Sequence, residues 1–283
     1  MPVPARVFVY GSLLPGEMRH PVLESSRPLG PALIRGRLYD LGRYPALTAG
    51  PGSVVGEVFE VDGFTLRQLD RIEGWTPQVP GKALYRRQQE TVRYLADGRH
   101  ERVFVYRYNR KAGGRLIGHG DYRRQRLERA EDAQWVLAYG SNLCPDRLSA
   151  RVGTPLALER GAVPGFVLRF NKHAQGGGSA CANLGWAGGH ARCPAVAWKL
   201  EPQQIEALDA CEGTPDHYLK VALPFLGERR GWRLCQAYVA HPDRLTDRYR
   251  PTEVYANHLR RGYAHHGFDS RALERLLAPS RAG

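Results

Sequence analysis

The sequence predicts an α+β fold that occurs twice in one chain. Its 283 residues are enough for two domains of ordinary size. Short apolar runs typical of strands outnumber helical segments, and they do not alternate with helices as in a βαβ protein. The same short motifs also return in the same order in the second half of the chain. These three observations favour two copies of one mixed domain.

Four landmarks make up the repeat. A strand-like run ends in Tyr-Gly-Ser-x-Leu, and a later helical segment ends in Glu-Gly; two separate tyrosines follow in each copy. The pairs are VFVYGSLLPG at 7–16 with VLAYGSNLCP at 136–145, LRQLDRIEG at 66–74 with IEALDACEG at 205–213, Tyr85 with Tyr218, and Tyr106 with Tyr238. Because their order and offset are kept, we expect one domain over 1–128 and another over 134–283. The charged residues 123–134 between them would form a linker or a short connecting helix.

Apolar runs bounded by Gly, Pro or Asp-Gly predict the strands, and segments with helical spacing predict the helices. In the first copy we expect strands over 35–41 and 54–61, a helix over 64–72, and strands over 83–94 and 101–108. In the second copy we expect strands over 165–170, 180–184 and 194–199, a helix over 202–211, strands over 218–225 and 232–240, and helices over 249–266 and 271–277.

Composition excludes several classes of protein. Hydrophobic residues are 42% and charged residues 24%, which is ordinary for a folded soluble chain. No run of about 18 apolar residues is present, and Met1 is followed almost at once by a strand-like run, so we expect neither a membrane span nor a signal peptide and place the protein in the cytoplasm. The five cysteines form no Cys-x-x-Cys pair, which argues against zinc ribbons and thioredoxin motifs. The net charge of +13 comes from scattered arginines without a nucleic-acid-binding motif, so we do not expect a nucleic-acid partner.

Glu73 and Glu212 are the most informative residues. Each follows two apolar residues at spacing i, i+3, i+7, which places all three on one face of a helix, toward the core. Each also precedes a glycine that fits the C′ position, so its carboxylate lies at the negative end of the helix dipole. Burial and the dipole both favour a protonated carboxyl group.

An alternative interpretation is that each glutamate curls outward into solvent or caps a neighbouring backbone group. Because a glutamate occurs at this position twice, in register with the other landmarks, we favour a functional pair. Asp70 and Asp209 lie three residues earlier and off the apolar stripe, so we expect them to be more exposed, although they could share the site.

The Tyr-Gly-Ser turns are the second candidate feature. A strand that stops at Gly-Ser leaves backbone N–H groups without ladder partners, and these can bind a carboxylate or a developing oxyanion. Glycine would allow a positive φ and a close approach of ligand or backbone.

Together these residues resemble the gamma-glutamylcyclotransferase-like superfamily. Tyr139-Gly-Ser-Asn-Leu143 with Leu208-Asp-x-x-Glu212-Gly is similar to gamma-glutamylcyclotransferase itself. Tyr10-Gly-Ser-Leu-Leu14 with Leu69-Asp-x-x-Glu73-Gly is similar to the AIG2-like branch, which includes gamma-glutamylamine cyclotransferases. The resemblance covers nearly the whole chain, and one departure within it is Leu13 where the second copy has Asn142.

The resemblance implies two tandem mixed β-barrel domains with flanking helices, each with a cavity beside its Tyr-Gly-Ser turn. It implies Glu73 and Glu212 as general acid/base residues. It implies substrate-binding positions at Tyr10, Gly11, Ser12, Leu13 and Tyr106 in the first domain, and at Tyr139, Gly140, Ser141, Asn142, Leu143 and Tyr238 in the second. The two late tyrosines could equally be aromatic residues of the core.

The implied reaction fits these residue types. In a gamma-glutamyl compound the α-amine can attack its own side-chain carbonyl, so the reaction needs a base but no Ser or Cys nucleophile, metal or cofactor. The products are 5-oxoproline and a free amino acid or amine. We expect a small-molecule gamma-glutamyl substrate, with the second copy as the more active one; the sequence does not indicate the oligomeric state.

Two other functions stay open. The altered first motif and the positive charge would also suit a binding protein without catalysis on the same scaffold. A deprotecting enzyme of a biosynthetic pathway would need a second cavity that opens under the glycine-rich loop 176–178 to admit a bulky leaving group. His217, His265 and His266 have no partners at zinc-ligand spacing, and we expect them on the surface.

Overall fold

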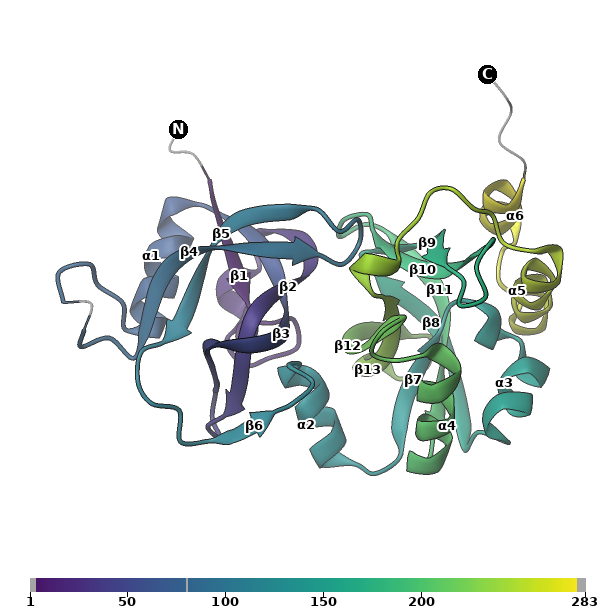
Figure 1. Ribbon diagram of the computed structural model, residues 1–283, viewed down its shortest axis with the longest axis horizontal. Coiled ribbons are helices and arrows are strands. Elements are labelled where there is room, and N and C mark those ends of the chain that lie inside the picture. The colour runs from purple at the N-terminus through teal and green to yellow at the C-terminus, as the bar shows by residue number, and fades with distance from the viewer. Residues whose placement is uncertain (1–3, 80, 279–283) are drawn as a thin grey trace, which may run out of the picture. The chain divides into compact units, whose positions relative to one another are not determined.

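The computed structural model describes residues 4–79 and 81–278, which divide into two compact units, Met1–Arg126 and Leu127–Gly283. Each unit contains a closed five-stranded barrel with helices attached to it (Figure 1). The predicted α+β fold with two tandem barrels is therefore confirmed. Within the described ranges, no helix is long and apolar enough to cross a membrane.

The described residues of the first unit form six strands, two helices and one 3₁₀ turn. The strands are β1 (Ala5–Val9), β2 (Arg27–Asp40), β3 (Pro45–Val61), β4 (Tyr85–Tyr94), β5 (His100–Tyr108) and β6 (Arg115–Ile117). The helices are α1 (Gly63–Glu73) and α2 (Tyr122–Ala130), which crosses the boundary between the units, and the 3₁₀ turn is His20–Leu23.

Up to residue 278, the second unit forms seven strands and four helices. The strands are β7 (Gln134–Ala138), β8 (Ala157–Pro164), β9 (Phe166–His173), β10 (Ala180–Trp186), β11 (Arg192–Leu200), β12 (Tyr218–Gly227) and β13 (Gly231–Ala240). The helices are α3 (Pro145–Val152), α4 (Pro202–Glu212), α5 (Glu253–His266) and α6 (Arg271–Leu277), and 3₁₀ turns lie at Ser141–Leu143 and Pro242–Arg244.

The two barrels have the same strand order. In the first, the order is β3-β1-β5-β4-β2, closed by pairing of β2 with β3; in the second it is β11-β7-β13-β12-β8, closed by pairing of β8 with β11. Each barrel has one parallel pair, β1 with β5 and β7 with β13, and each of those first strands runs directly into a Tyr-Gly-Ser turn. The repeat in the sequence is therefore a repeat of topology, and it places equivalent residues at equivalent points of each barrel.

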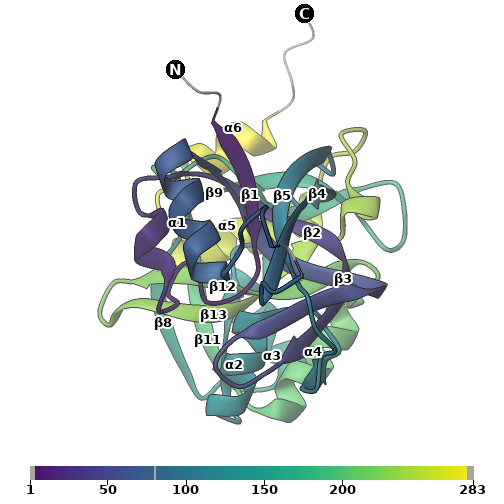
Figure 2. The same ribbon diagram turned by 90° about the vertical axis from the view of Figure 1, so that its left-hand side faces the viewer.

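Strand β1 shows how each barrel separates its interior from its outer layer. Successive side chains of a strand point to opposite faces, and Phe8 packs in one apolar cluster with Ile34 and Val105. Val7 and Val9 pack in another cluster with Leu69 of α1. Helix α1 thus covers the outside of the barrel beside β1 (Figure 2).

Both site-bearing helices have well-defined ends. The Asp62 carboxylate accepts a hydrogen bond of 2.7 Å from the Thr65 backbone N–H and caps α1. A capping box formed by Glu201 and Gln204 begins α4. Gly74 and Gly213 end the two helices in the left-handed conformation, with φ of 66° and 63°. The predicted C′ glycines are confirmed, and each helix therefore stops immediately after its glutamate.

Of the two alternatives for residues 123–134, the structure has the connecting helix, because α2 covers 122–130. Several other elements differ from the sequence expectations. Strands β2 and β3 are far longer than predicted, since Pro28 and Gly30 obscured a strand that accommodates them at a register shift. Helix α3 and strand β8 were not predicted. The helix expected over 249–266 begins only at Glu253, because the Thr252 hydroxyl caps it by accepting from the Tyr255 N–H.

Candidate functional site

The two Tyr-Gly-Ser turns are built alike. The Leu14 N–H donates to the Gly11 carbonyl at 2.9 Å, and the Leu143 N–H donates to the Gly140 carbonyl at 3.0 Å. A Cβ at Gly11 would lie 2.5 Å from Pro45 Cγ, and one at Gly140 would lie 2.8 Å from Ala182 Cβ. Neither glycine is among those with positive φ, so the close approach of a neighbouring segment, not backbone conformation, requires glycine here.

A pocket opens beside the first turn. Its lining comes from the end of β1, the turn and the segment after it, the start of β3, the end of α1, and strands β4 and β5. The residues are Phe8, Val9, Tyr10, Gly11, Ser12, Leu13, Arg19, Tyr44, Pro45, Glu73, Tyr85 and Tyr106. All six site residues predicted for the first domain therefore line one pocket.

Glu73 is half-buried in this pocket. Within residues 4–79 and 81–278, no group forms a hydrogen bond or ion pair with its carboxylate. Burial raises the pKa of Glu73 to about 7, and the nearby Arg19 guanidinium offsets part of that rise. At neutral pH this carboxyl group can therefore both accept and release a proton.

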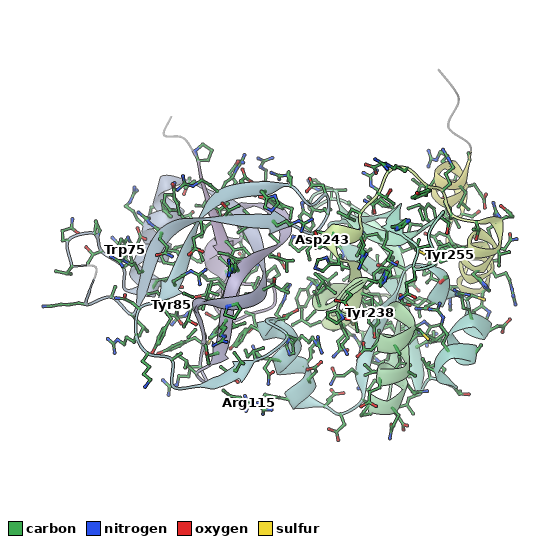
Figure 3. All side chains as sticks on the ribbon, viewed as in Figure 1. Trp75, Tyr85, Arg115, Tyr238, Asp243 and Tyr255 are labelled. Atoms are coloured by element: carbon green, nitrogen blue, oxygen red, sulfur yellow. The ribbon has the colours of Figure 1, made fainter. Side chains whose placement is uncertain are left out.

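The second pocket has an equivalent lining. The residues are Leu137, Ala138, Tyr139, Gly140, Ser141, Asn142, Ala182, Glu212, Tyr218, Tyr238 and Tyr255. Tyr238 lies on β13, while Tyr255 reaches the pocket from α5, an element without a counterpart in the first unit (Figure 3). The Tyr255 hydroxyl accepts a hydrogen bond of 3.0 Å from the Ala182 N–H, so α5 closes one side of this pocket.

Glu212 differs from Glu73 in its partners. Asn142 Nδ2 and Arg151 Nη1 each donate to Glu212 Oε1 at 2.9 Å, and Arg151 Nη1 also donates to Asn142 Oδ1 at 2.8 Å. In the first pocket the position equivalent to Asn142 is Leu13, whose side chain has no hydrogen-bond donor. The second carboxylate is therefore fixed by an ion pair and an amide, whereas the first is not.

A tyrosine and an aspartate support each glutamate from behind. The Tyr10 hydroxyl donates to the Tyr106 carbonyl at 2.6 Å, and the Tyr106 hydroxyl donates to Asp70 at 2.8 Å. Arg87 also donates to Asp70 at 2.8 Å. Because Asp70 lies one helical turn before Glu73, these bonds fix the end of α1 against β4 and β5.

The second unit repeats this network. The Tyr139 hydroxyl donates to the Tyr238 carbonyl, the Tyr238 hydroxyl donates to Asp209 at 2.6 Å, and Lys220 donates to Asp209 at 2.5 Å. The two aspartates are thus bound to strands and are not free in solvent. The tyrosines line the pockets with their rings while their hydroxyls are engaged.

The second turn is also held by residues that the sequence did not suggest. The His266 ring lies next to the Leu143 carbonyl, with Nε2 at 2.8 Å, and Trp198 Nε1 donates to the Asn142 carbonyl at 3.2 Å. His266 is 4% exposed, so the expected surface position is wrong for it: α5 packs on the turn and buries its last residue. Leu143, a predicted site residue, is fully buried behind the turn and does not line the pocket.

The pockets also contain residues that the sequence does not mark as site residues. Tyr85 and Tyr218 belong to the repeat, and each lines its pocket. Their hydroxyls donate to the Pro45 and Ala182 carbonyls, each at 2.7 Å. Arg19 and Arg151 lie on segments with no repeat pattern. The glycine-rich residues 176–178 do not line the second pocket. The described residues contain no group of three His, Cys, Asp or Glu side chains that could hold a metal ion.

Comparison with known proteins shows a similarity in sequence to one family. The model of the family described as gamma-glutamyl cyclotransferase, AIG2-like, matches residues 7–124. YtfP of Escherichia coli K12, a gamma-glutamylcyclotransferase family protein, is 34% identical over 119 residues, which cover 41% of this chain and 95% of YtfP. A Vibrio cholerae protein that carries the family's name is 51% identical over 69 residues, which cover 24% of this chain and only 60% of that protein.

One solved structure matches both units together. YkqA from Bacillus subtilis superimposes with a TM-score of 0.76 and covers 97% of this chain and 98% of its own. The identity is 20%, so this likeness concerns the fold, which YkqA shares along nearly the whole chain.

Proposed function

Because the chain belongs to the gamma-glutamylcyclotransferase family, we propose that it converts gamma-glutamyl compounds to 5-oxoproline with release of the amine. The α-amine nitrogen attacks the γ-carbonyl carbon, a new C–N bond closes the five-membered lactam, and the amide bond to the leaving amine breaks. The proton lost by the attacking amine reaches the leaving amine, so no water is consumed.

Glu73 is the proposed general acid/base of the first pocket. The attacking amine is mostly protonated at neutral pH and must lose a proton, and a general base works best when its pKa lies near the working pH. The observation that supports this role is a half-buried carboxylate with a pKa of about 7, unpaired among the described residues, beside the turn. The same group, once protonated, can donate to the departing amine.

The turn would hold the substrate and stabilise the transition state. In the described chain, the N–H groups of Ser12 and Leu13 donate to no protein acceptor, so they are available to a carboxylate or a tetrahedral oxyanion. Folding the substrate so that its amine lies against its own carbonyl contributes through proximity. Burial raises the pKa of Tyr85, which keeps its phenol neutral against the reacting groups.

The second pocket has equivalent residues, but its proposed base, Glu212, is already bonded to Asn142 and Arg151. Glu212 must leave a charge-assisted hydrogen bond from Arg151 before it can take a proton at the bonded oxygen. This ion pair favours the first pocket as the more active site at neutral pH, in contrast to the sequence expectation. It also favours a second candidate function for this pocket alone, which is ligand binding without turnover.

Single and double substitutions test these roles. We expect Glu73→Gln to remove most release of 5-oxoproline from a panel of gamma-glutamyl amino acids and amines at pH 7.5, by roughly a hundredfold or more. Glu212→Gln should leave the 5-oxoproline release by the first pocket unchanged. Full activity in the double variant would contradict both assignments, and Glu24→Gln, an exposed change in the first unit, is the matched control.

Binding without turnover has its own readout. If the second pocket only binds, Glu73→Gln produces no 5-oxoproline, while isothermal titration detects a gamma-glutamyl compound bound at two sites, one in each pocket. Residual turnover in Glu73→Gln that disappears in the double variant would assign catalysis to the second pocket as well.

A further inference from the structure

The first pocket contains a second charged side chain that the proposed reaction does not use. Among the described residues that line it, Arg19 and Glu73 are the only ones with a basic or carboxylic side chain. The remaining lining is aromatic, apolar or backbone. The Arg19 guanidinium would therefore be the cation that meets a substrate group entering this pocket.

Arg19 is held in place by its backbone. Its N–H donates to the Ser12 carbonyl at 2.9 Å, so the segment after the turn folds back onto it. The next residue, His20, has Nδ1 3.0 Å from the Leu13 carbonyl, and its ring contacts Phe59 edge-on at 5.9 Å between centroids. Arg19 is thus fixed at the turn, where a substrate would lie.

The Arg19 guanidinium is uncommitted in the described structure. No carboxylate or carbonyl of residues 4–79 and 81–278 accepts a hydrogen bond from it. The nearby acid Glu17 pairs with Arg126 instead. A half-buried guanidinium without a protein partner is suited to a carboxylate of the ligand, which it can bind through two parallel hydrogen bonds.

The two candidate substrate classes differ by one such carboxylate. A gamma-glutamyl amino acid carries the glutamyl α-carboxylate and the carboxylate of the leaving amino acid, whereas a gamma-glutamyl amine carries only the first. The turn N–H groups are available for the first carboxylate. Given the proposed function, we infer that Arg19 binds the carboxylate of the leaving amino acid and makes the first pocket selective for gamma-glutamyl amino acids over gamma-glutamyl amines.

The charge on Arg19 also affects the base. The Arg19 guanidinium lowers the pKa of Glu73 against the effect of burial. A leaving-group carboxylate that neutralises Arg19 would restore the basicity of Glu73, whereas an uncharged amine would not. Selection would therefore act on catalysis as well as on binding.

The second pocket provides an internal contrast. None of its described lining residues is a cation, and the nearby Arg151 is already bonded to Glu212 and Asn142. Arg147 also interacts electrostatically with Glu212, and its Nε has no hydrogen-bond partner among the described residues, but it does not line this pocket. The inferred selectivity is therefore assigned to the first pocket and must be measured there.

The experiment compares two substrates that differ only in that carboxylate. Gamma-glutamyl-alanine and gamma-glutamyl-ethylamide are supplied to the Glu212→Gln chain, and kcat/KM is measured from the release of 5-oxoproline. We expect gamma-glutamyl-alanine to be preferred by roughly tenfold or more, because gamma-glutamyl-ethylamide leaves the Arg19 guanidinium in the pocket without a carboxylate partner. Arg19→Gln should remove this preference, because it lowers kcat/KM for gamma-glutamyl-alanine much more than kcat/KM for gamma-glutamyl-ethylamide, and Arg19→Lys should keep part of it.

Controls separate the possible failures. Arg67→Gln removes one charge from the exposed face of α1 and should leave the preference unchanged. Equal rates with both substrates, or an equal loss with both in Arg19→Gln, would overturn the inference, the latter because Arg19 would then serve the glutamyl half. No 5-oxoproline from either substrate would overturn the proposed function itself.

Discussion

One residue position distinguishes the two carboxylates. Asn142 donates to Glu212 across 2.9 Å, while Leu13, at the same place in the first repeat, leaves Glu73 without an amide partner. Hydrogen bonds to a carboxylate favour its ionised form, and burial without them favours the protonated form. The departure from the repeat at this position thus has a physical consequence, because it contributes to a base whose pKa lies near 7.

Leu13→Asn should therefore shift the pH dependence of the first pocket. An added amide donor stabilises the ionised Glu73, so its pKa falls below about 7 and the active base form persists at lower pH. In the Glu212→Gln background we expect kcat/KM for gamma-glutamyl-alanine to retain more of its pH 8 value at pH 6. Leu13→Met, which is apolar and of similar size, should keep the original profile; an unchanged profile in Leu13→Asn would argue against Glu73 as the titrating base.

At the scale of elements, the end of a helix positions each acid. Helix α1 stops at Gly74 and α4 stops at Gly213, and one turn earlier Asp70 and Asp209 bind the strand tyrosines. The glutamate is consequently the last residue of a helix that is anchored to the barrel on the inner side of its final turn. A short helix fixed in this way keeps its carboxylate at the mouth of the pocket.

Gly74→Ala tests the importance of this helix end. A Cβ at Gly74 would meet no atom nearer than 3.9 Å, so the substitution introduces backbone strain at φ 66° without a steric clash. We expect the free energy of unfolding of the first unit to fall by about 1 kcal/mol, measured by urea titration, together with a lower kcat as Glu73 moves. Gly63→Ala, at the first residue of the same helix, lacks a positive φ and should cause neither change; equal effects from both would contradict this account.

At the scale of the whole molecule, each barrel closes with its own strands. The two apolar clusters of the first unit contain residues of that unit only. Helix α2 is tied to the first barrel by a buried ion pair, in which Arg123 Nη2 lies 2.8 Å from Glu57 Oε1 and the two side chains are 1% and 8% exposed. We propose that the functional domain boundary lies after α2.

A chain of residues 1–132 should consequently fold and work by itself. We expect a single cooperative unfolding transition and a kcat/KM for gamma-glutamyl-alanine within about threefold of the full-length Glu212→Gln chain, since no part of the first pocket is removed. A chain of residues 1–117 lacks Arg123 and leaves Glu57 buried without its partner, which is strongly destabilising. If 1–132 is unfolded, or if 1–117 is equally stable, the proposed boundary is wrong.

The sequence by itself determined the duplication, the α+β class, the two site-bearing helices with their C′ glycines, and the association of Glu73 and Glu212 with the Tyr-Gly-Ser turns. These features depend on local spacing and on repetition, which can be recognised in the amino-acid sequence. The full lengths of strands β2 and β3 cannot be predicted in this way, because prolines and glycines within them indicate turns unless a barrel accommodates them.

Only the tertiary structure decided which charges lie near each glutamate. Arg19 is 54 positions from Glu73 in the chain, and Arg151 is 61 positions from Glu212, so neither pairing has a local signature. The segment after the first turn brings Arg19 to the end of α1, and α3 brings Arg151 to the end of α4. The resulting burial and charge give one carboxylate a pKa near 7 and commit the other to an ion pair. Proton affinity depends on all neighbours in space, whereas periodicity records only neighbours along the chain.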